Sequence, residues 1–175
     1  MELYEKNLRD LTSEEWEKIC MKCGKCCLTK YDINGIVYLT NQVCRFFDKQ
    51  KCECSRYVTR LQDAKGECQK VDIDLIENHF DILPPTCAYR LLFEGKPLPA
   101  YHPLLTGNAN SVIESGQSIR SWEIVSEQKL YEELDEVHHR AEAEQWSKNR
   151  IVQEEYKIRQ KYRLRFLFAY PVKKK

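Results

Sequence analysis

Cysteine is the residue type in this chain whose number and spacing could support chemistry. All nine cysteines lie between Cys20 and Cys87, and the chain after residue 87 has none. Four of them occupy one run, Cys-Met-Lys-Cys-Gly-Lys-Cys-Cys, at residues 20–27. A thiolate at neutral pH needs a cation beside it, so thiols clustered at two-residue spacing are typical of metal ligands. The sequence therefore predicts that this run binds metal.

The first three cysteines of the run have the spacing of a metal knuckle. Two residues separate Cys20 from Cys23, which lets both sulfurs reach one ion while backbone N–H groups point at them. Gly24 follows and permits the positive φ that such a turn requires. Together with Cys26 they form C-x2-C-x2-C, a spacing also found in iron–sulfur loops. The side chain of Cys27 diverges from that of its neighbour Cys26, so one of the pair could serve a second metal site.

The other five cysteines could complete these sites. Cys52 and Cys54 form a C-x-C pair whose sulfurs project to one side of an extended segment, and three further thiols stand singly. The predicted metal ligands are Cys20, Cys23, Cys26, Cys27, Cys44, Cys52, Cys54, Cys68 and Cys87, enough for two four-ligand sites with one thiol left over. For a single thiol such as Cys52 or Cys87, the alternative is a plain buried core residue. Zinc and an iron–sulfur cluster both suit thiolates, so the spacing leaves the cofactor open between them.

Composition and charge favour a cytoplasmic globular protein. The 175 residues suffice for one domain and an appendage. No stretch approaches the roughly 18–20 apolar residues of a membrane span, and the acidic N-terminus lacks the layout of a signal peptide. We therefore expect no transmembrane segment and a reducing compartment, where structural disulfides are rare. An odd number of cysteines cannot all pair within one chain, which also favours metal or redox chemistry.

The elements expected around the cysteines are short. Thr12 and Glu15 form a capping box that predicts a helix leading into the cysteine run. Residues 36–40 are β-branched and apolar and predict a short strand. Helical turns are expected at 73–80 and 87–95, an extended loop at 96–107 and a strand at 118–125.

The C-terminal part predicts one long charged helix. No Gly or Pro occurs from Ser126 to about Phe166, and apolar residues recur at the helical spacing of Leu130, Leu134, Val137 and Ala141. We therefore expect an α-rich α+β fold with few short strands. Its parts are an irregular cysteine-cluster domain organised around metal, residues 1–125, and a long helix with a basic tail, residues 126–175.

The tail has two interpretations. From residue 156 onward there are eight basic residues and no acidic one, interleaved with aromatic side chains. This pattern is compatible with contact to nucleic acid or an anionic membrane surface. It also fits a segment that packs back on the domain through Phe166, Leu167 and Phe168, with its charges in water. The packing interpretation is preferred here.

Few other residues suggest chemistry. His102 could complete a mixed Cys/His site, but a histidine bonded to a backbone carbonyl is the preferred interpretation. Arg60, three residues after Tyr57, could donate to a thiolate and offset the negative charge of a thiolate site; it could equally pair with a carboxylate. His138 and its neighbour His139 lie beside acidic residues and fit a solvated helix face.

The cysteine pattern resembles a known family. The run C-x2-C-x2-C-C, then Cys44, then Cys54-x-x-Tyr57-x-x-Arg60 and Cys68, resembles the bacterial cysteine-cluster family described as zinc- or iron-chelating. Segments 15–17 (Glu-Trp-Glu), 87–92 (Cys-Ala-Tyr-Arg-Leu-Leu) and 102–107 (His-Pro-Leu-Leu-Thr-Gly) are similar to its uncharacterised YcgN-like branch. So are Cys52 and Cys87, which the broad pattern lacks. The resemblance covers about residues 12–138.

This resemblance implies a small soluble metal-binding protein without an assigned reaction, in a structural or metal-handling role. The alternative is an iron–sulfur enzyme or redox sensor, because some members of the broad family resemble protein lysine N-methylases acting on flagellin. Those members are longer, and their additional parts are not recognisable here. The chain also has no glycine-rich nucleotide loop. Partners other than a metal ion, and whether there is a reaction, stay open.

Overall fold

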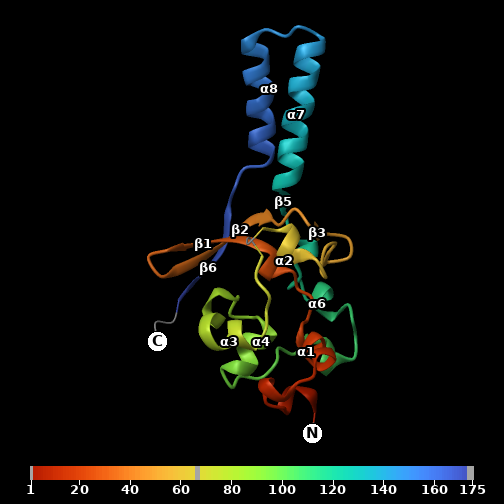
Figure 1. Ribbon diagram of the computed structural model, residues 1–175, viewed down its shortest axis with the longest axis vertical. Coiled ribbons are helices and arrows are strands. Elements are labelled where there is room, and N and C mark those ends of the chain that lie inside the picture. The colour runs from red at the N-terminus through yellow and green to blue at the C-terminus, as the bar shows by residue number, and fades with distance from the viewer. Residues whose placement is uncertain (1, 66–67, 173–175) are drawn as a thin grey trace.

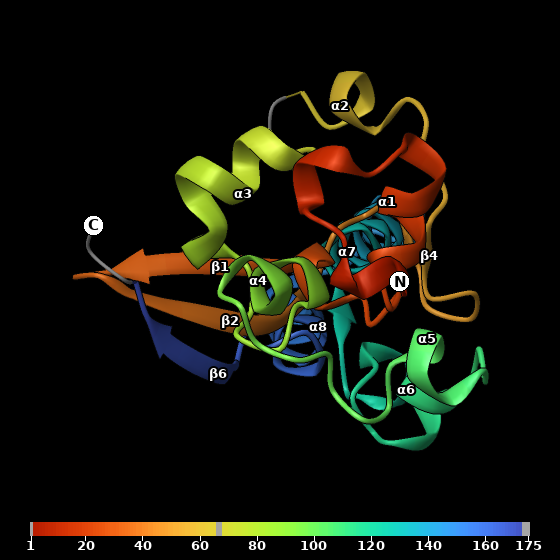
Figure 2. The same cartoon turned by 90° about the horizontal axis from the view of Figure 1, so that it is seen from below.

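A central β-sheet separates a two-helix arm from a group of short helices. The computed structural model describes residues 2–65 and 68–172. In Figure 1 the arm stands above the sheet and the short helices lie below it. Figure 2 views the arm end-on behind the sheet, so the arm projects away from the helical side of the molecule.

The N-terminal helix α1 (Ser13–Ile19) begins as the sequence predicts. Thr12 is its N-cap: the Thr12 hydroxyl accepts a hydrogen bond from the Glu15 N–H at 3.3 Å, and the Glu15 carboxylate accepts one from the Thr12 N–H at 3.0 Å. The Trp16 ring stacks on that of Tyr89 with centroids 4.7 Å apart. The capping box therefore fixes where the helix starts, and the stacked ring fixes which face is buried.

Short helices build the first hydrophobic core. Its buried members come from the N-terminal turn η2 (Leu8–Asp10), from α1, from Met21 and from segments after residue 70. The turn η1 (Leu3–Glu5) packs against them through partly buried side chains. The later elements are α3 (Ile73–His79), η4 (Phe80–Ile82), α4 (Ala88–Phe93), α5 (Pro103–Thr106) and α6 (Ser111–Glu114); α2 (Arg60–Asp63) lies apart from this core. The helices expected at 73–80 and 87–95 are confirmed, whereas the loop expected at 96–107 contains α5. His102 caps α5 and Pro103 occupies its first turn, which favours a helix start there.

A mixed four-stranded sheet builds the second core. The strand β2 (Ile36–Val43) pairs antiparallel with β1 (Leu28–Ile33) on one side. On its other side β2 pairs antiparallel with β6 (Phe166–Pro171) and, over two residues, in parallel with β5 (Val125–Ser126). A second small sheet joins β3 (Phe47–Asp48) to β4 (Glu53–Cys54). The buried residues of this core are Leu28, Val37, Leu39, Val43, Ile119 and Tyr170.

The expected fold class is wrong in its architecture. An irregular domain organised around metal was expected, but the described residues are organised around two apolar cores, one of which lies on a regular sheet. The sequence signal for β1 was weak because its residues, Leu-Thr-Lys-Tyr-Asp-Ile, are half exposed. Of the expected strand at 118–125, residues Ile119–Ser121 form the 3-10 turn η5, and only Val125 belongs to a strand.

The prediction of a single long C-terminal helix is also wrong. Residues 126–166 form two antiparallel helices, α7 (Glu127–Ala143) and α8 (Lys148–Lys161), which pack against each other. The helix ends at Ala143 because Gln145 adopts a positive φ of 53°, and Ser147 caps the start of α8. No Gly or Pro marks this turn, so composition did not reveal it. The expected inward face is confirmed for Leu134, Val137 and Ala141.

The C-terminal tail packs back on the domain as strand β6, but through other residues than expected. Phe166, Leu167 and Phe168 are exposed, Phe166 at 57%. Tyr170 is the buried member, at 4%, and its hydroxyl donates to the Ile82 carbonyl at 2.8 Å. The strand therefore joins the sheet to the helical side of the molecule. Residues 173–175 of the basic tail lie outside the described residues. Over residues 2–65 and 68–172, no helix has both the length and the apolar character needed to cross a bilayer.

Candidate metal centre

The cysteine run passes from the first core to the second. Cys20 ends α1, and Cys26 and Cys27 lie in the 3-10 turn η3 (Lys25–Cys27), which leads directly into β1. Cys23 packs against the first core, as does Cys87 at the N-cap of α4, whereas Cys27 packs against the second core. The remaining thiols follow β2 or lie in and beyond the small β3–β4 sheet. The fold thus places the run between its two apolar clusters.

Two residues with positive φ turn the chain between the first thiols. Lys22 has φ 51° and Gly24 has φ 78°. A Cβ atom on Gly24 would lie 2.7 Å from Cγ1 of Ile119 and 2.9 Å from Cζ of Phe47. The Ile119 N–H also donates to the Cys23 carbonyl at 2.9 Å. The expected need for glycine is confirmed, and the close approach of η5 adds a second reason for it.

Four thiols form a group beside α1 and α4. Desolvation raises the pKa of Cys20 to about 12, that of Cys87 to about 11 and that of Cys23 still further, and a charged Cys26 adds to each. The four sulfurs are therefore close enough to interact electrostatically. Cys20 and Cys26 keep solvent-accessible surface while being surrounded by protein atoms. Without a metal, Cys20, Cys23 and Cys87 would be neutral thiols at pH 7.

Backbone N–H groups point at three of these sulfurs. The Lys22 N–H donates to Cys20 and the Lys25 N–H donates to Cys23. The N–H groups of Tyr89 and Arg90 donate to Cys87. Each of these hydrogen bonds lowers the pKa of its thiol, but desolvation raises that pKa more strongly. Donors directed at a sulfur favour the thiolate over the thiol. The turn and the N-terminus of α4 thus supply what a metal knuckle needs.

A buried lysine lies beside the same group. Lys25 is 6% exposed and donates to the Thr86 hydroxyl at 3.2 Å and to the Gln117 side-chain oxygen at 2.9 Å. Its ammonium also lies 5.3 Å from the centre of the Trp122 ring. Within the described part of the chain no carboxylate lies at ion-pair distance from it. Desolvation lowers the pKa of Lys25, while charges on Cys23 and Cys87 would raise it.

A second group of thiols gathers around the ends of β2 and β4. The Cys44 N–H donates to the Cys27 carbonyl at 3.0 Å, and the Phe47 N–H donates to the Cys44 carbonyl at 3.0 Å. Phe47 in turn is the strand partner of Cys54. Cys68 interacts electrostatically with Cys44 and Cys54, and less strongly with Cys26 of the first group. These contacts bring together thiols that are 41 residues apart at the extremes, from Cys27 to Cys68.

Cys52 stands outside both groups. It is 6% exposed, and its thiol donates to the Lys22 carbonyl at 3.2 Å. Its sulfur also lies 3.1 Å from the Ser118 hydroxyl, in a hydrogen bond in which either atom can donate. A thiol that donates to a carbonyl carries its proton in that arrangement. Cys52 therefore fastens the loop that bears Cys20 and Cys23.

The thiols are not arranged as a formed coordination sphere. All nine cysteines are free. Among residues 2–65 and 68–172, no group of three or more His, Cys, Asp or Glu side chains is disposed to hold a metal ion. The structure therefore brings the predicted ligands into two neighbourhoods without bringing their sulfurs to coordination distance.

Sequence comparison gives the family. No family model matches the chain, and no solved structure matches it. A UPF0260 protein of Marinobacter nauticus is 43% identical over 135 residues, which are 76% of this chain and 89% of the relative. One from Vibrio atlanticus is 43% identical over 119 residues, 67% of this chain and 81% of the relative. The chain belongs to the UPF0260 family.

Membership of the UPF0260 family agrees with the resemblance to the YcgN-like branch. A third UPF0260 protein, from Rhodobacter capsulatus, is 41% identical over 128 residues, 72% of this chain and 85% of the relative. The names of these relatives state no reaction, ligand or partner, which is consistent with an unassigned role.

The other residues singled out in this UPF0260 sequence have structural partners. His102 is fully buried; its Nε2 hydrogen-bonds the Ile19 carbonyl at 3.0 Å, and its Nδ1 accepts from the Leu104 N–H at 3.1 Å. The preferred interpretation of His102 is confirmed. His138 pairs with Glu155 at 2.6 Å on the exposed side of the arm.

Arg60 lies near thiols of both groups. It donates to the Tyr57 carbonyl and lies over the Tyr57 ring at 3.9 Å, while the Tyr57 hydroxyl donates to the Glu17 carboxylate at 2.7 Å. The positive charge of Arg60 lowers the pKa of Cys26, where a hydrogen bond donated by the Cys27 thiol is the larger cause. It also acts to lower the pKa of Cys68, but desolvation raises that pKa more strongly. The suggestion that Arg60 offsets thiolate charge therefore agrees with its effect on these two pKa values.

The sequence analysis did not identify Lys25 and Ser118 as residues of the site. Lys25 lies inside the cysteine run, and its position between ligands was the available signal. Ser118 is 66 residues from Cys52, and nothing local marks their contact.

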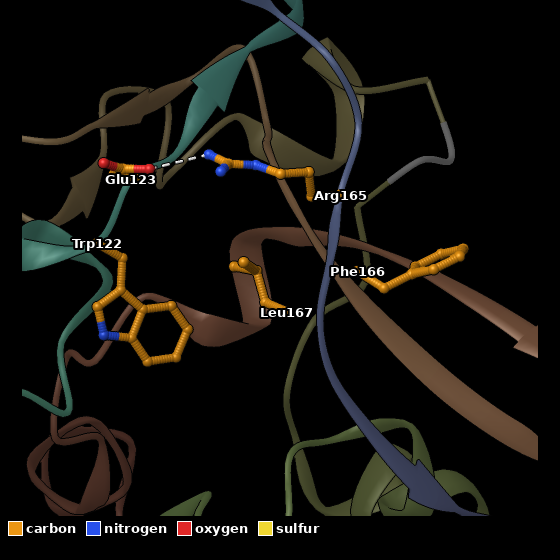
Figure 3. Close-up of a pocket in the computed structure, with 5 residues that line it drawn as sticks. All are labelled: Trp122, Glu123, Arg165, Phe166 and Leu167. Carbon is orange, nitrogen blue, oxygen red and sulfur yellow. Dashed lines mark hydrogen bonds and ion pairs between the residues drawn. The ribbon is translucent and has the colours of Figure 1, made fainter.

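An open depression of about 540 Å³ lies at the base of the arm, lined by Trp122, Glu123, Arg165, Phe166 and Leu167. Figure 3 shows the Phe166 ring on the opposite side of the β6 strand from Leu167 and Trp122, and the ion pair of Glu123 with Arg165 across the opening. No cysteine lines this depression.

Proposed function

We propose that this UPF0260 protein binds a metal ion through the thiolates of Cys20, Cys23, Cys26 and Cys87. The observation that carries the proposal is Lys25, a buried ammonium beside two of these thiols. The role that fits is structural or metal-handling, and the proposal assigns no reaction.

A buried cation requires an anion. Taking an ammonium out of water costs several kcal/mol unless an opposite charge compensates it. Two hydrogen bonds to neutral oxygens and one aromatic ring satisfy the donors of Lys25 but leave its charge uncompensated. Thiolates at Cys23 and Cys87 would supply the negative charge, and a metal would keep those thiolates ionised despite their desolvation.

The donor set fits the metals expected from the sequence. Four thiolates are a ligand set of structural zinc sites and of iron–sulfur clusters. Bound zinc would add to the stability of the loop between the two cores, and a cluster would add the capacity to carry an electron. The sulfurs stand apart in the structure, so coordination requires rotation about the Cα–Cβ bonds of the ligands, each of which is a single torsion.

Metal content tests the proposal. Protein purified without oxygen should contain stoichiometric zinc, or iron with broad visible absorption, by elemental analysis and spectroscopy. Cys87→Ser should lose that metal, because it removes one ligand, whereas Cys52→Ser should keep it. Metal-free protein from anaerobic purification, unable to bind added zinc or iron with sulfide, would contradict the proposal.

Lys25 gives a second, more specific test. Lys25→Met should weaken zinc binding roughly 10- to 100-fold, the usual cost of removing an outer-shell partner of a metal site. Lys18→Met is the matched control, because Lys18 is an exposed lysine of α1 and should leave affinity unchanged. Zinc affinity is measured by competition with a chromophoric chelator. Equal zinc affinities in the two variants would mean that the buried Lys25 charge does not support a metal site here.

A further inference from the structure

We infer that the outer face of the four-stranded sheet, the face turned away from the short helices, binds a single-stranded nucleic acid. Its bases stack on Tyr31, Tyr38 and Phe166, and its phosphates contact the basic segment that enters β6. The strands β1, β2 and β6 contain no cysteine, so this surface is separate from the proposed metal site and its role does not depend on metal binding.

Exposed aromatic rings from three strands share this face. Tyr31 lies directly opposite Tyr38 in the pairing of β1 with β2, so the two side chains point to the same side of the sheet. The centroid of the Phe166 ring, from β6, lies 5.1 Å from that of Tyr38 and 6.5 Å from that of Tyr31. Tyr31 is 43% exposed and Phe166 is 57% exposed. The three rings therefore form one aromatic cluster that is open to solvent.

The fold buries the other face of the same sheet. Tyr170 lies opposite Val37 on that side, and its hydroxyl reaches the Ile82 carbonyl among the short helices. Figure 3 shows Phe166 on the opposite side of the strand from Trp122, which packs against the second core. The aromatic cluster thus lies on the side of the sheet from which the arm projects (Figure 1).

The composition of the outer face suits nucleobases. Every base has a flat π-face, and stacking on Tyr and Phe rings is the sequence-tolerant mode by which proteins bind single strands. Ile33 and Ile36 lie opposite each other beside the rings, both exposed, and widen the apolar surface. Asp32 lies opposite Val37 and so belongs to the other face. Among the described residues paired on the outer face, none is acidic and able to repel a phosphate.

Positive charge lies at the edge of the cluster, where the phosphates of a stacked strand would run. Helix α8 leads into β6, and residues 156–172 contain five basic side chains and no acidic one. Three of the five form ion pairs at the surface. Exposed ion pairs are weak, so a phosphate can replace the carboxylate. The five basic residues are Lys157, Arg159, Lys161, Arg163 and Arg165.

A buried asparagine fixes the basic segment beside Phe166. Asn41 is fully buried and follows Thr40, the strand partner of Phe166. The Asn41 side-chain amide donates to the Arg163 carbonyl at 3.2 Å, and its oxygen accepts from the Arg165 N–H at 2.7 Å. The Asn41 N–H donates to the Arg165 carbonyl at 2.9 Å. Three hydrogen bonds therefore hold two exposed arginines next to the aromatic cluster, which pairs a stacking surface with cations in fixed positions.

The arm favours a flexible strand over a flat membrane as the occupant. Basic and aromatic side chains also suit an anionic bilayer surface. The arm projects on the same side as the aromatic cluster, and its helix α7, with 17 residues, is about 25 Å long. A planar bilayer would meet the tip of the arm before it reached the rings. A single strand of nucleic acid can pass along the base of the arm.

Fluorescence anisotropy of the full chain with labelled oligothymidylate and oligouridylate of about 12 nucleotides tests this role. Binding should weaken steeply between low and physiological salt as counterions are released. Phe166→Ala should weaken binding roughly 5- to 100-fold, because it removes one stacking ring. Phe168→Ala is the matched control, since Phe168 lies in the same strand but opposite Leu39 on the other face, and it should leave affinity unchanged. Circular dichroism shows that each variant is folded.

Arg163→Gln gives a second test that leaves the aromatic cluster intact. It should weaken binding and reduce the slope of log affinity against log salt by about one, because one phosphate contact is lost. Lys148→Gln removes the same charge from an exposed position at the start of α8, at the far tip of the arm, and should change neither quantity.

The outcomes also separate nucleic acid from other occupants of the face. Failure of both probes to bind at low salt would overturn the inferred role, as would equal weakening by Phe166→Ala and Phe168→Ala. Binding to vesicles of phosphatidylcholine and phosphatidylserine, but to neither probe, would assign the face to a membrane. A dimer in analytical ultracentrifugation that Phe166→Ala dissociates, without probe binding, would assign it to a second copy of the chain. Probe binding by a protein that holds no metal would support this role while contradicting the proposed function.

Discussion

Gly24 is required for two separate reasons, its backbone conformation and the close packing around it. Its φ of 78° lies in the left-handed region, and its missing Cβ leaves room for Ile119 and Phe47. Gly35 has the same φ of 78°, but nothing lies within 4 Å of its Cβ position. Comparing substitutions at the two glycines therefore distinguishes the cost of backbone strain from the cost of overpacking.

Gly24→Ala should cost considerably more stability than Gly35→Ala. Both variants carry the left-handed penalty of about 1–2 kcal/mol. Gly24→Ala adds the cost of overpacking, about 1–3 kcal/mol, because the new methyl group meets Ile119. The measurement is the free energy of unfolding from urea denaturation of each variant. Equal losses would mean that η5 moves away from the loop without cost.

For single residues, the turn that bears the candidate ligands could be predicted from the sequence, but the contacts of the residues around them could not. Cys20, Cys23 and Gly24 carry a local spacing signal, so the turn could be predicted before the structure. Burial of Lys25 depends on Thr86 and Gln117, which are 61 and 92 residues away. Cys52 was predicted as a possible chelating partner of Cys54, and nothing local in the sequence marks its contacts with Lys22 and Ser118.

Among the elements, the arm is where composition misled most. Its apolar spacing was correctly assigned to a helix, but the turn at 144–147 is made without Gly or Pro. Gln145 follows the C-cap Glu144 in the left-handed conformation, a position at which glycine is preferred.

Gln145→Gly should therefore stabilise the protein by about 0.5–1 kcal/mol, because glycine adopts positive φ without a steric penalty. Gln153→Gly, at an exposed position inside α8, makes the same chemical change and should destabilise by about 0.5–1 kcal/mol. Thermal unfolding of both variants measures the difference. Destabilisation by Gln145→Gly as well would mean that residues 127–161 form one continuous helix.

The sheet illustrates a different limit of sequence reasoning. Strand β2 was recognisable because it is β-branched and apolar, although it extends to Val43 rather than ending near residue 40. Its partner β6 starts 123 residues after Val43, and nothing local specifies that pairing. Residues of β6 with strong apolar character stayed exposed, since the register assigns the buried position to Tyr170.

On the scale of the whole molecule, the thiols lie between two apolar cores and do not replace them. Each core has buried aliphatic or aromatic side chains from segments far apart in the chain. Tyr170 bridges them through the Ile82 carbonyl. Cohesion on both sides of the cysteine run thus comes from burial of apolar surface, and a bound metal would add to it at the junction.

Removal of metal should then weaken the fold without abolishing it. A ligand that binds only the folded state stabilises it in proportion to its affinity and free concentration, so adding EDTA should lower the melting temperature. Because the two cores need no metal to bury their side chains, the chelated protein should keep most of its helical circular dichroism and still unfold in one cooperative transition. The variant Cys20→Ser/Cys44→Ser, which lacks one ligand from each thiol group, is the control, and EDTA should not shift its melting temperature. Loss of the helical signal and of the cooperative transition on chelation would mean that ligation, rather than the apolar cores, organises the fold.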